Sequence, residues 1–158
     1  MRWPSARLEV TEAFDIAAYS PKRQLVLLAE VKWLKESSEE NAVFFRRNLL
    51  SHSLLSDVPY FLLAYRSGFF LWKGSSDPGS SPDFRAPAKP VLKKYLGTLA
   101  DTERGPGPEG MEAAVRLWLS ELASGIQEPD PKSEPDRMLV ESGLYEQIKG
   151  GEVRRQSL

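Results

Sequence analysis

The chain has 158 residues and no cysteine, which excludes disulfide bonds and thiolate metal sites. Its 41% apolar and 27% charged residues suit a globular protein, and neither a membrane span nor a secretion signal is visible, so we expect a cytoplasmic protein without a membrane partner. The charge is uneven: residues 1–100 hold 14 Lys/Arg against 10 Asp/Glu (+4), and residues 101–158 hold 7 against 12 (−5). The basic front half suits an anionic partner, although an excess of this size is also ordinary scatter.

The first third of the chain predicts a hairpin. Residues 7–20 contain β-formers in partial alternation and predict one or two strands. Pro21 suits the first central position of a turn. Residues 24–33, QLVLLAEVKW, are apolar on both faces, which predicts a central strand covered on both sides.

The rest of the chain alternates helices, strands and loops. A helix is expected over 37–55, capped by Ser37 or Ser38. A hairpin of two strands, 59–65 and 69–73, should follow it. The remaining segments are predicted as a loop (74–87), a helix (89–100), a linker (101–110), a helix (111–124), an acidic linker (127–136) and a short final helix or two turns (137–151).

These elements predict an α/β fold, with a mixed sheet of about four strands and flanking helices. We expect residues 1–100 to form the core. Residues 101–158 should be a linker followed by a helical, acidic appendage.

The charges of the expected central strand need an explanation. Strand side chains alternate, so Glu30 and Lys32 share one face. A two-residue or a four-residue loop at Pro21 brings Asp15 to that same face, opposite Leu28 or Glu30 respectively, whereas an odd-length loop or a bulge reverses it. Two carboxylates that meet resist joint ionisation, and Mg²⁺ or Mn²⁺ between them removes the conflict. The alternative is an ion pair at a strand end, which is a poor way to stabilise a core.

Asp15, fourteen intervening residues and then Glu30-Val31-Lys32 resemble the signature of the PD-(D/E)XK nuclease superfamily, the restriction-endonuclease-like fold. The order of hairpin, ExK strand, helix and strand is similar too, and residues 44–73 resemble bacterial and cyanobacterial members. The resemblance implies a Mg²⁺- or Mn²⁺-dependent nuclease, in which Asp15, Glu30 and the Val31 carbonyl bind metal and Lys32 is catalytic.

The sequence departs from this pattern in two places. Phe14 stands where the name-giving proline would be. Members also have a helix before the hairpin, often with a further acidic residue, but here only residues 1–6 precede the first expected strand, and they include Pro4. Glu9 or Glu12 could supply the further carboxylate.

Other basic residues are candidates for contacts with nucleic acid phosphate. Arg46 and Arg47 lie on the helix after the motif, and Lys93 and Lys94 on the helix over 89–100. A solvated helix face is the more common explanation of each pair.

Two functions from different classes remain. One is a metal-dependent phosphodiesterase acting on nucleic acid, with DNA as the expected substrate and a homodimer as one arrangement that would cut both strands. The other is a restriction-endonuclease-like binding or assembly module without catalysis, which the missing first helix favours.

Overall fold

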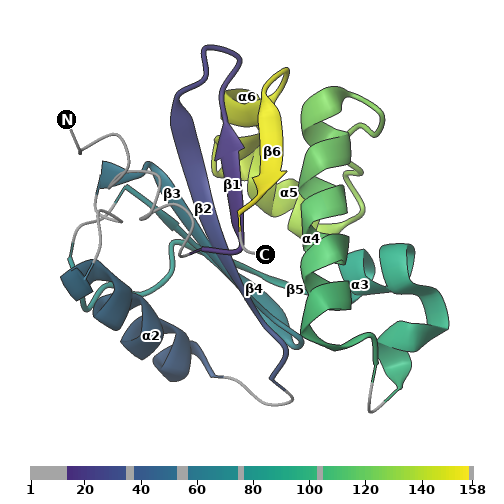
Figure 1. Cartoon of the computed structure of the whole chain (residues 1–158), viewed down its shortest axis with the longest axis horizontal. Helices are drawn as coiled ribbons and strands as arrows, with labels where there is room; N and C mark the ends of the chain where they lie inside the picture. Colours follow the sequence, from purple (N-terminus) through teal and green to yellow (C-terminus); the bar gives the residue numbers. More distant parts are fainter. Residues whose placement is uncertain (1–13, 35–37, 53–56, 75–76, 103–104, 157–158) are drawn as a thin grey trace.

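The computed structural model describes residues 14–34, 38–52, 57–74, 77–102 and 105–156, and these form one mixed sheet with helices on both faces (Figure 1). The sheet has six strands in the order β5-β4-β3-β2-β1-β6, and β2 and β3 are its parallel pair among antiparallel neighbours. The strands are β1 (Ile16–Tyr19), β2 (Leu25–Lys32), β3 (Tyr60–Tyr65), β4 (Gly68–Lys73), β5 (Phe84–Pro87) and β6 (Glu152–Arg155).

The helices divide between the two faces of the sheet (Figure 1). They are α2 (Glu39–His52), α3 (Lys89–Leu96), α4 (Gly107–Ser124), α5 (Glu134–Glu141) and α6 (Leu144–Ile148), with a 3₁₀ turn, η2, over Gly97–Asp101. On the face we call the α4 face, helices α3 to α6 bury the larger apolar cluster, where the Trp118 ring stacks on Phe69 at 5.2 Å. On the opposite α2 face, α2 helps to cover a smaller cluster around Phe61 and Trp72.

The central strand predicted from its apolar composition is confirmed as β2. Strand β2 lies between β1 and β3, and Leu27, Leu28 and Ala29 are fully buried because both faces are covered. The start of α2 also follows from the sequence, since the Ser38 hydroxyl accepts a hydrogen bond of 3.1 Å from the Asn41 N–H. The hairpin of β3 and β4 was predicted correctly as well.

The chain after residue 73 differs from the prediction in two strands. Strand β5 lies inside the segment expected to be a loop, and β6 follows the expected final helix. Both are edge strands of four residues, too short to show a clear periodic pattern. The exposed charges of β6 suit an edge that should not pair with other chains.

The predicted boundary at residue 100 does not separate two structural units. Helix α4 begins at Gly107, inside the expected linker, and its residues Val115 and Leu119 are fully buried in the larger cluster. Strand β6 pairs with β1 and extends the same sheet. The described residues after 101 therefore contribute to the same sheet and the same apolar cluster as the residues before it.

Gly151, at the start of β6, gives a test of how tightly this last strand docks. A Cβ atom added at Gly151 would overlap the backbone oxygen of Tyr19. We expect Gly151→Ala to lower the free energy of unfolding by about 1–3 kcal/mol, the usual cost of overpacking, in urea denaturation. Gly79→Ala is the matched control, because its new Cβ would lie 3.8 Å from Asp77 Oδ1. Equal stability of the two variants would contradict this view of the docking.

Candidate functional site

The site begins with the connection between β1 and β2. Ser20 and Gln24 close a three-residue loop through a hydrogen bond of 2.9 Å from the Ser20 N–H to the Gln24 carbonyl. The last loop residue, Arg23, has a left-handed φ of 65°. A three-residue loop with its last residue in this conformation is a common hairpin connection.

An odd-length loop alone would have placed Asp15 on the wrong face, but a second irregularity compensates for it. The register shifts by one residue between Ala18 and Tyr19, as in a β-bulge. The two one-residue shifts cancel, so Ile16 pairs with Ala29, as it would with a four-residue loop. Asp15, the residue before β1, is thereby brought beside the Ala29–Val31 segment of β2, where its charge acts on Glu30.

Asp15 is fixed against β2 by its backbone and its side chain. Its N–H donates to the Ala29 carbonyl at 3.2 Å, and its Oδ2 accepts a hydrogen bond of 2.8 Å from the Val31 N–H. The carboxylate is therefore held at the start of β1, beside the ExK segment. A hydrogen bond of this kind to a charged acceptor is stronger than one between neutral groups.

Glu30 is the most perturbed group of the site. Its side chain is 15% exposed, and its Oε1 is buried without a hydrogen-bond partner among the described residues. Burial, followed by the charge of Asp15, raises the pKa of Glu30 from 4.5 to about 7, against the opposing effect of Lys32. The predicted meeting of the two carboxyl groups is thus present, with the conflict that such a pair creates.

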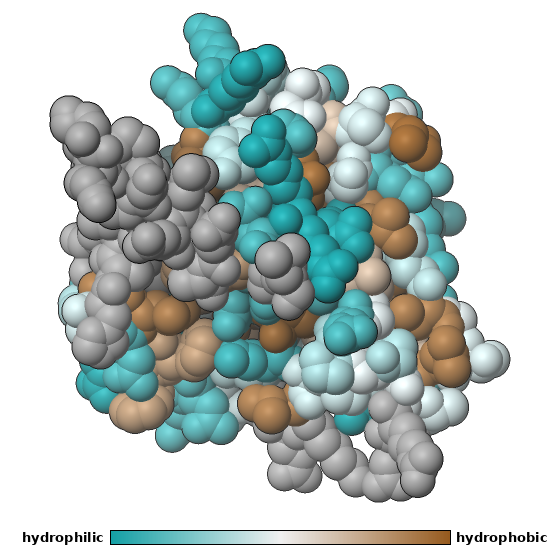
Figure 2. Space-filling view, in the orientation of Figure 1, coloured by the Kyte–Doolittle hydropathy of each residue, from teal (hydrophilic) through white to brown (hydrophobic). Residues whose placement is uncertain are grey.

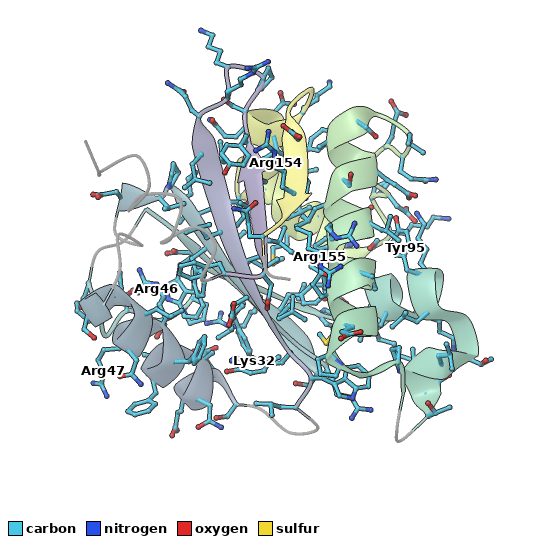
Figure 3. All side chains as sticks on the ribbon, viewed as in Figure 1. Lys32, Arg46, Arg47, Tyr95, Arg154 and Arg155 are labelled. Atoms are coloured by element: carbon cyan, nitrogen blue, oxygen red, sulfur yellow. The ribbon has the colours of Figure 1, made fainter. Side chains whose placement is uncertain are left out.

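Lys32 is held from two sides. Its Nζ lies 3.6 Å from Glu30 Oε2 and 4.5 Å from the centre of the Phe45 ring on α2. An ammonium group over an aromatic face is attracted by the ring quadrupole. The Phe45 ring of α2 therefore helps to hold the amine beside Glu30, and Figure 3 shows Lys32 between α2 and the sheet.

The Val31 carbonyl also belongs to this place. In an extended strand, the N–H and the C=O of one residue point to the same edge of the strand. The Val31 N–H points toward Asp15, so its carbonyl points to the β1 side of β2 as well. Two carboxylates, a carbonyl oxygen and an amine thus gather where β1 begins. No group of three or more His, Cys, Asp or Glu side chains that could hold a metal occurs in the described part of the chain, and Glu9 and Glu12 lie outside it.

Of the two arginines predicted to contact nucleic acid, Arg46 is not placed for that role. It is 2% exposed, and its Nη1 donates to the Asp77 carbonyl and the Ser80 hydroxyl at 3.1 and 3.2 Å. Its guanidinium also lies over the Trp72 ring, and burial lowers its pKa. Arg46 therefore fixes a loop against α2 instead of meeting a ligand. Arg47 is exposed and points away from the sheet in Figure 3.

The two predicted lysine contacts lie on the other side of the sheet. Helix α3, which carries Lys93 and Lys94, packs on the α4 face, whereas Lys32 contacts α2 on the opposite face. Lys93 Nζ is 3.8 Å from Asp101 Oδ2, and Lys94 Nζ donates to Gln127 Oε1 at 3.3 Å. Neither lysine shares a surface with the carboxylates.

One residue beside the site was missed by sequence reasoning. The Gln156 N–H donates to the Asp15 carbonyl at 2.9 Å, which sets Gln156 next to Asp15 in the sheet. The two residues are far apart in the chain, and β6 has no signal that names its partner strand.

Comparisons with protein-family models, with curated proteins and with solved structures give no match to this chain. Among the described helices, none combines the length and the apolar character needed to cross a membrane.

The raised pKa of Glu30 predicts a pH-dependent stability. Between pH 4.5 and about 7 the folded state keeps a proton that the unfolded state releases, so this group's contribution to stability is lost as the pH rises. We expect Glu30→Gln to be more stable than the wild type by about 2–3 kcal/mol at pH 8 and nearly equal to it at pH 4.5, in urea titrations. Glu128→Gln, at an exposed carboxylate, should show no such trend. A wild-type-to-variant difference that is constant with pH would contradict the assignment.

Proposed function

We propose that this chain is a metal-dependent phosphodiesterase that cleaves nucleic acid and has a restriction-endonuclease-like core. The observation that carries the proposal is the buried, unpartnered Oε1 of Glu30 beside Asp15 and Lys32. Buried polar atoms nearly always have a hydrogen-bond partner in native proteins, so an exception indicates a bound group that supplies one. A cation between the two carboxylates would offset their mutual repulsion.

The donor set fits Mg²⁺ or Mn²⁺. Carboxylate and carbonyl oxygens are the ligands that these hard cations prefer, and Mg²⁺ is commonly held by one or two carboxylates with water and substrate phosphate. Asp15, Glu30 and the Val31 carbonyl would hold the ion. When bound, such an ion acts as a Lewis acid at a phosphate oxygen.

The chain's own groups have distinct tasks in this proposal. The Val31 N–H orients the Asp15 carboxylate, so its oxygens are fixed before any ligand arrives. The ammonium of Lys32, kept in place by Phe45, stabilises negative charge that develops on the phosphate during attack by water. Because these groups lie on a strand and on packed elements, little reorganisation is needed.

The order of elements supports the fold part of the proposal. A hairpin with Asp15 at its start leads into the strand that carries Glu30 and Lys32, and α2 connects this strand to the parallel strand β3. This is the order that the sequence resemblance implies. The additional strands β5 and β6 extend the sheet at its two edges.

A second candidate is a module of the same fold that binds nucleic acid or a protein without cleaving. The described residues offer two carboxylates at the site and no third His, Cys, Asp or Glu ligand, which favours this candidate. The intact trio of Asp15, Glu30 and Lys32 favours the enzyme.

Nuclease activity is the direct test. Purified protein should cleave single- or double-stranded DNA with Mg²⁺ or Mn²⁺, and Asp15→Asn and Lys32→Met should each lower the rate by about 100-fold or more. Lys132→Met, at an exposed lysine outside the site, should cleave as the wild type does. A wild type that is as inactive as both variants under all conditions would contradict the enzyme.

Metal binding can be measured without activity. Millimolar Mg²⁺ should raise the melting temperature of the wild type and leave that of Asp15→Asn unchanged, because only a folded site that binds the ion is stabilised by it. The same shift in both proteins would place the ion elsewhere. A metal-dependent shift without cleavage would leave the binding module as the better description.

A further inference from the structure

We propose that Arg23 and Arg154 form a second phosphate subsite, which binds the backbone of the same nucleic acid strand farther along the sheet from the carboxylates. The proposal rests on the proposed function and names where its substrate extends. The subsite is a hollow of about 450 Å³ between the β1–β2 turn and the start of β6. It is lined by Tyr19, Ser20, Pro21, Arg23, Gly150, Gly151, Glu152 and Arg154.

The walls of the hollow are built from two closely packed backbone segments. Gly151 leaves no room for a Cβ atom against Tyr19, and a Cβ at Gly150 would lie 3.4 Å from the Pro21 ring. Arg23 has a left-handed φ of 65°, a conformation that usually falls to Gly or Asn. A bulky residue in this conformation is an uncommon choice, and here it places a cation at the rim of the hollow.

The hollow has an excess of positive charge. Arg23 and Arg154 are exposed, and Glu152 is the one carboxylate among the lining residues. Arg154 Nε lies 3.0 Å from Glu152 Oε2, and its guanidinium carbon is 5.4 Å from the centre of the Tyr19 ring. Both arginines lower the pKa of Glu152. A guanidinium fixed by a carboxylate and a ring presents its remaining N–H groups in the fork that suits phosphate.

The hollow lies in line with the carboxylates. The Gln156 N–H donates a hydrogen bond to the Asp15 carbonyl, and the backbone of Arg154 is two residues earlier on the same strand, about 7 Å in an extended chain. The Arg154 guanidinium extends farther from Asp15, over the Tyr19 ring. Arg155 and Val153 point to the α4 face, where Arg155 Nε is 3.6 Å from Glu112 Oε1 and Val153 packs on the larger apolar cluster. Alternation therefore turns Arg154 and Gln156 to the α2 face, on which Lys32 lies. Figure 3 shows Arg154 and Arg155 on β6, with Arg155 directed toward α4.

The surface around β6 agrees with a charged ligand. Figure 2 shows hydrophilic residues along the middle of the visible face, where β1 and β6 lie in Figure 1. A polynucleotide carries its phosphates at regular intervals, so a strand that places one phosphate at the carboxylates can place a later phosphate in the hollow. Tyr19, in the lining of the hollow, is four residues from Asp15, which is about 13 Å along β1. A free phosphate ion has the same chemistry but does not bridge the two places.

The test is DNA binding in EDTA, where cleavage does not interfere. A fluorescein-labelled single-stranded 12-mer is titrated with full-length protein at several salt concentrations, and its anisotropy is read. We expect Arg23→Gln with Arg154→Gln to weaken binding by about tenfold and to reduce the slope of log affinity against log salt by about 0.7, the value for one phosphate contact on a single strand.

Two controls separate this subsite from general charge and from folding. Arg137→Gln, at an exposed arginine on α5, should bind as the wild type does, and all variants should keep the wild-type melting temperature because the replaced side chains are exposed. Inorganic phosphate at 10-fold excess over the DNA phosphate should compete poorly if the ligand is the polynucleotide. Efficient competition by phosphate, with weak DNA binding, would overturn the polynucleotide as ligand.

The remaining outcomes are decisive as well. A double variant that binds with wild-type affinity and salt slope, a wild type that does not bind the 12-mer, or an equal loss in Arg137→Gln would each overturn the subsite. Weakened binding by the double variant in a protein that never cleaves would keep the subsite and reject the nuclease. If the wild type cleaves and the double variant binds normally, the nuclease is kept and the subsite is rejected.

Discussion

The register of the β1–β2 hairpin is the constraint on which the candidate site depends. Shifting a strand by one residue moves every side chain to the opposite face, so a single irregularity between Asp15 and Glu30 would separate the two carboxyl groups. The structure contains two such irregularities, an odd-length loop ending at Arg23 and a bulge at Ala18 and Tyr19, and they cancel. The carboxyl groups meet because of this cancellation.

The proximity of the two carboxyl groups destabilises the ionised form of Glu30, and the surrounding elements only partly offset this. Lys32 and the Val31 N–H each relieve part of the repulsion, yet the pKa of Glu30 stays near 7 and its Oε1 stays without a partner among the described residues. Perturbed groups of this kind gather at functional sites, because burial and like charges are tolerated where a ligand offsets them. The apolar clusters on the two faces of the sheet stabilise the fold enough to tolerate such a site.

The two faces of the sheet divide these tasks. The α4 face carries the larger apolar cluster, closed by the long helix α4 and reinforced by buried polar contacts such as the bond of 2.8 Å from Trp118 Nε1 to Asp136 Oδ1. The α2 face has one helix among the described elements, and it leaves Glu30 and Lys32 partly accessible beside Phe45. Strand β6 connects the two faces, since Arg155 forms an ion pair with Glu112 of α4 while Gln156 lies beside Asp15.

The sequence by itself determined the central strand, the cap of α2 at Ser38, the β3–β4 hairpin and the trio of Asp15, Glu30 and Lys32, because each is written in local periodicity, turn chemistry or unexpected charge. It also left open which loop length joins β1 to β2. Only the tertiary structure decided that register, the burial of Arg46, the separation of Lys93 and Lys94 from the site, and the place of β6 beside β1. These features depend on contacts between residues distant in the chain, and a short charged strand such as β6 carries no local pattern that names its neighbour.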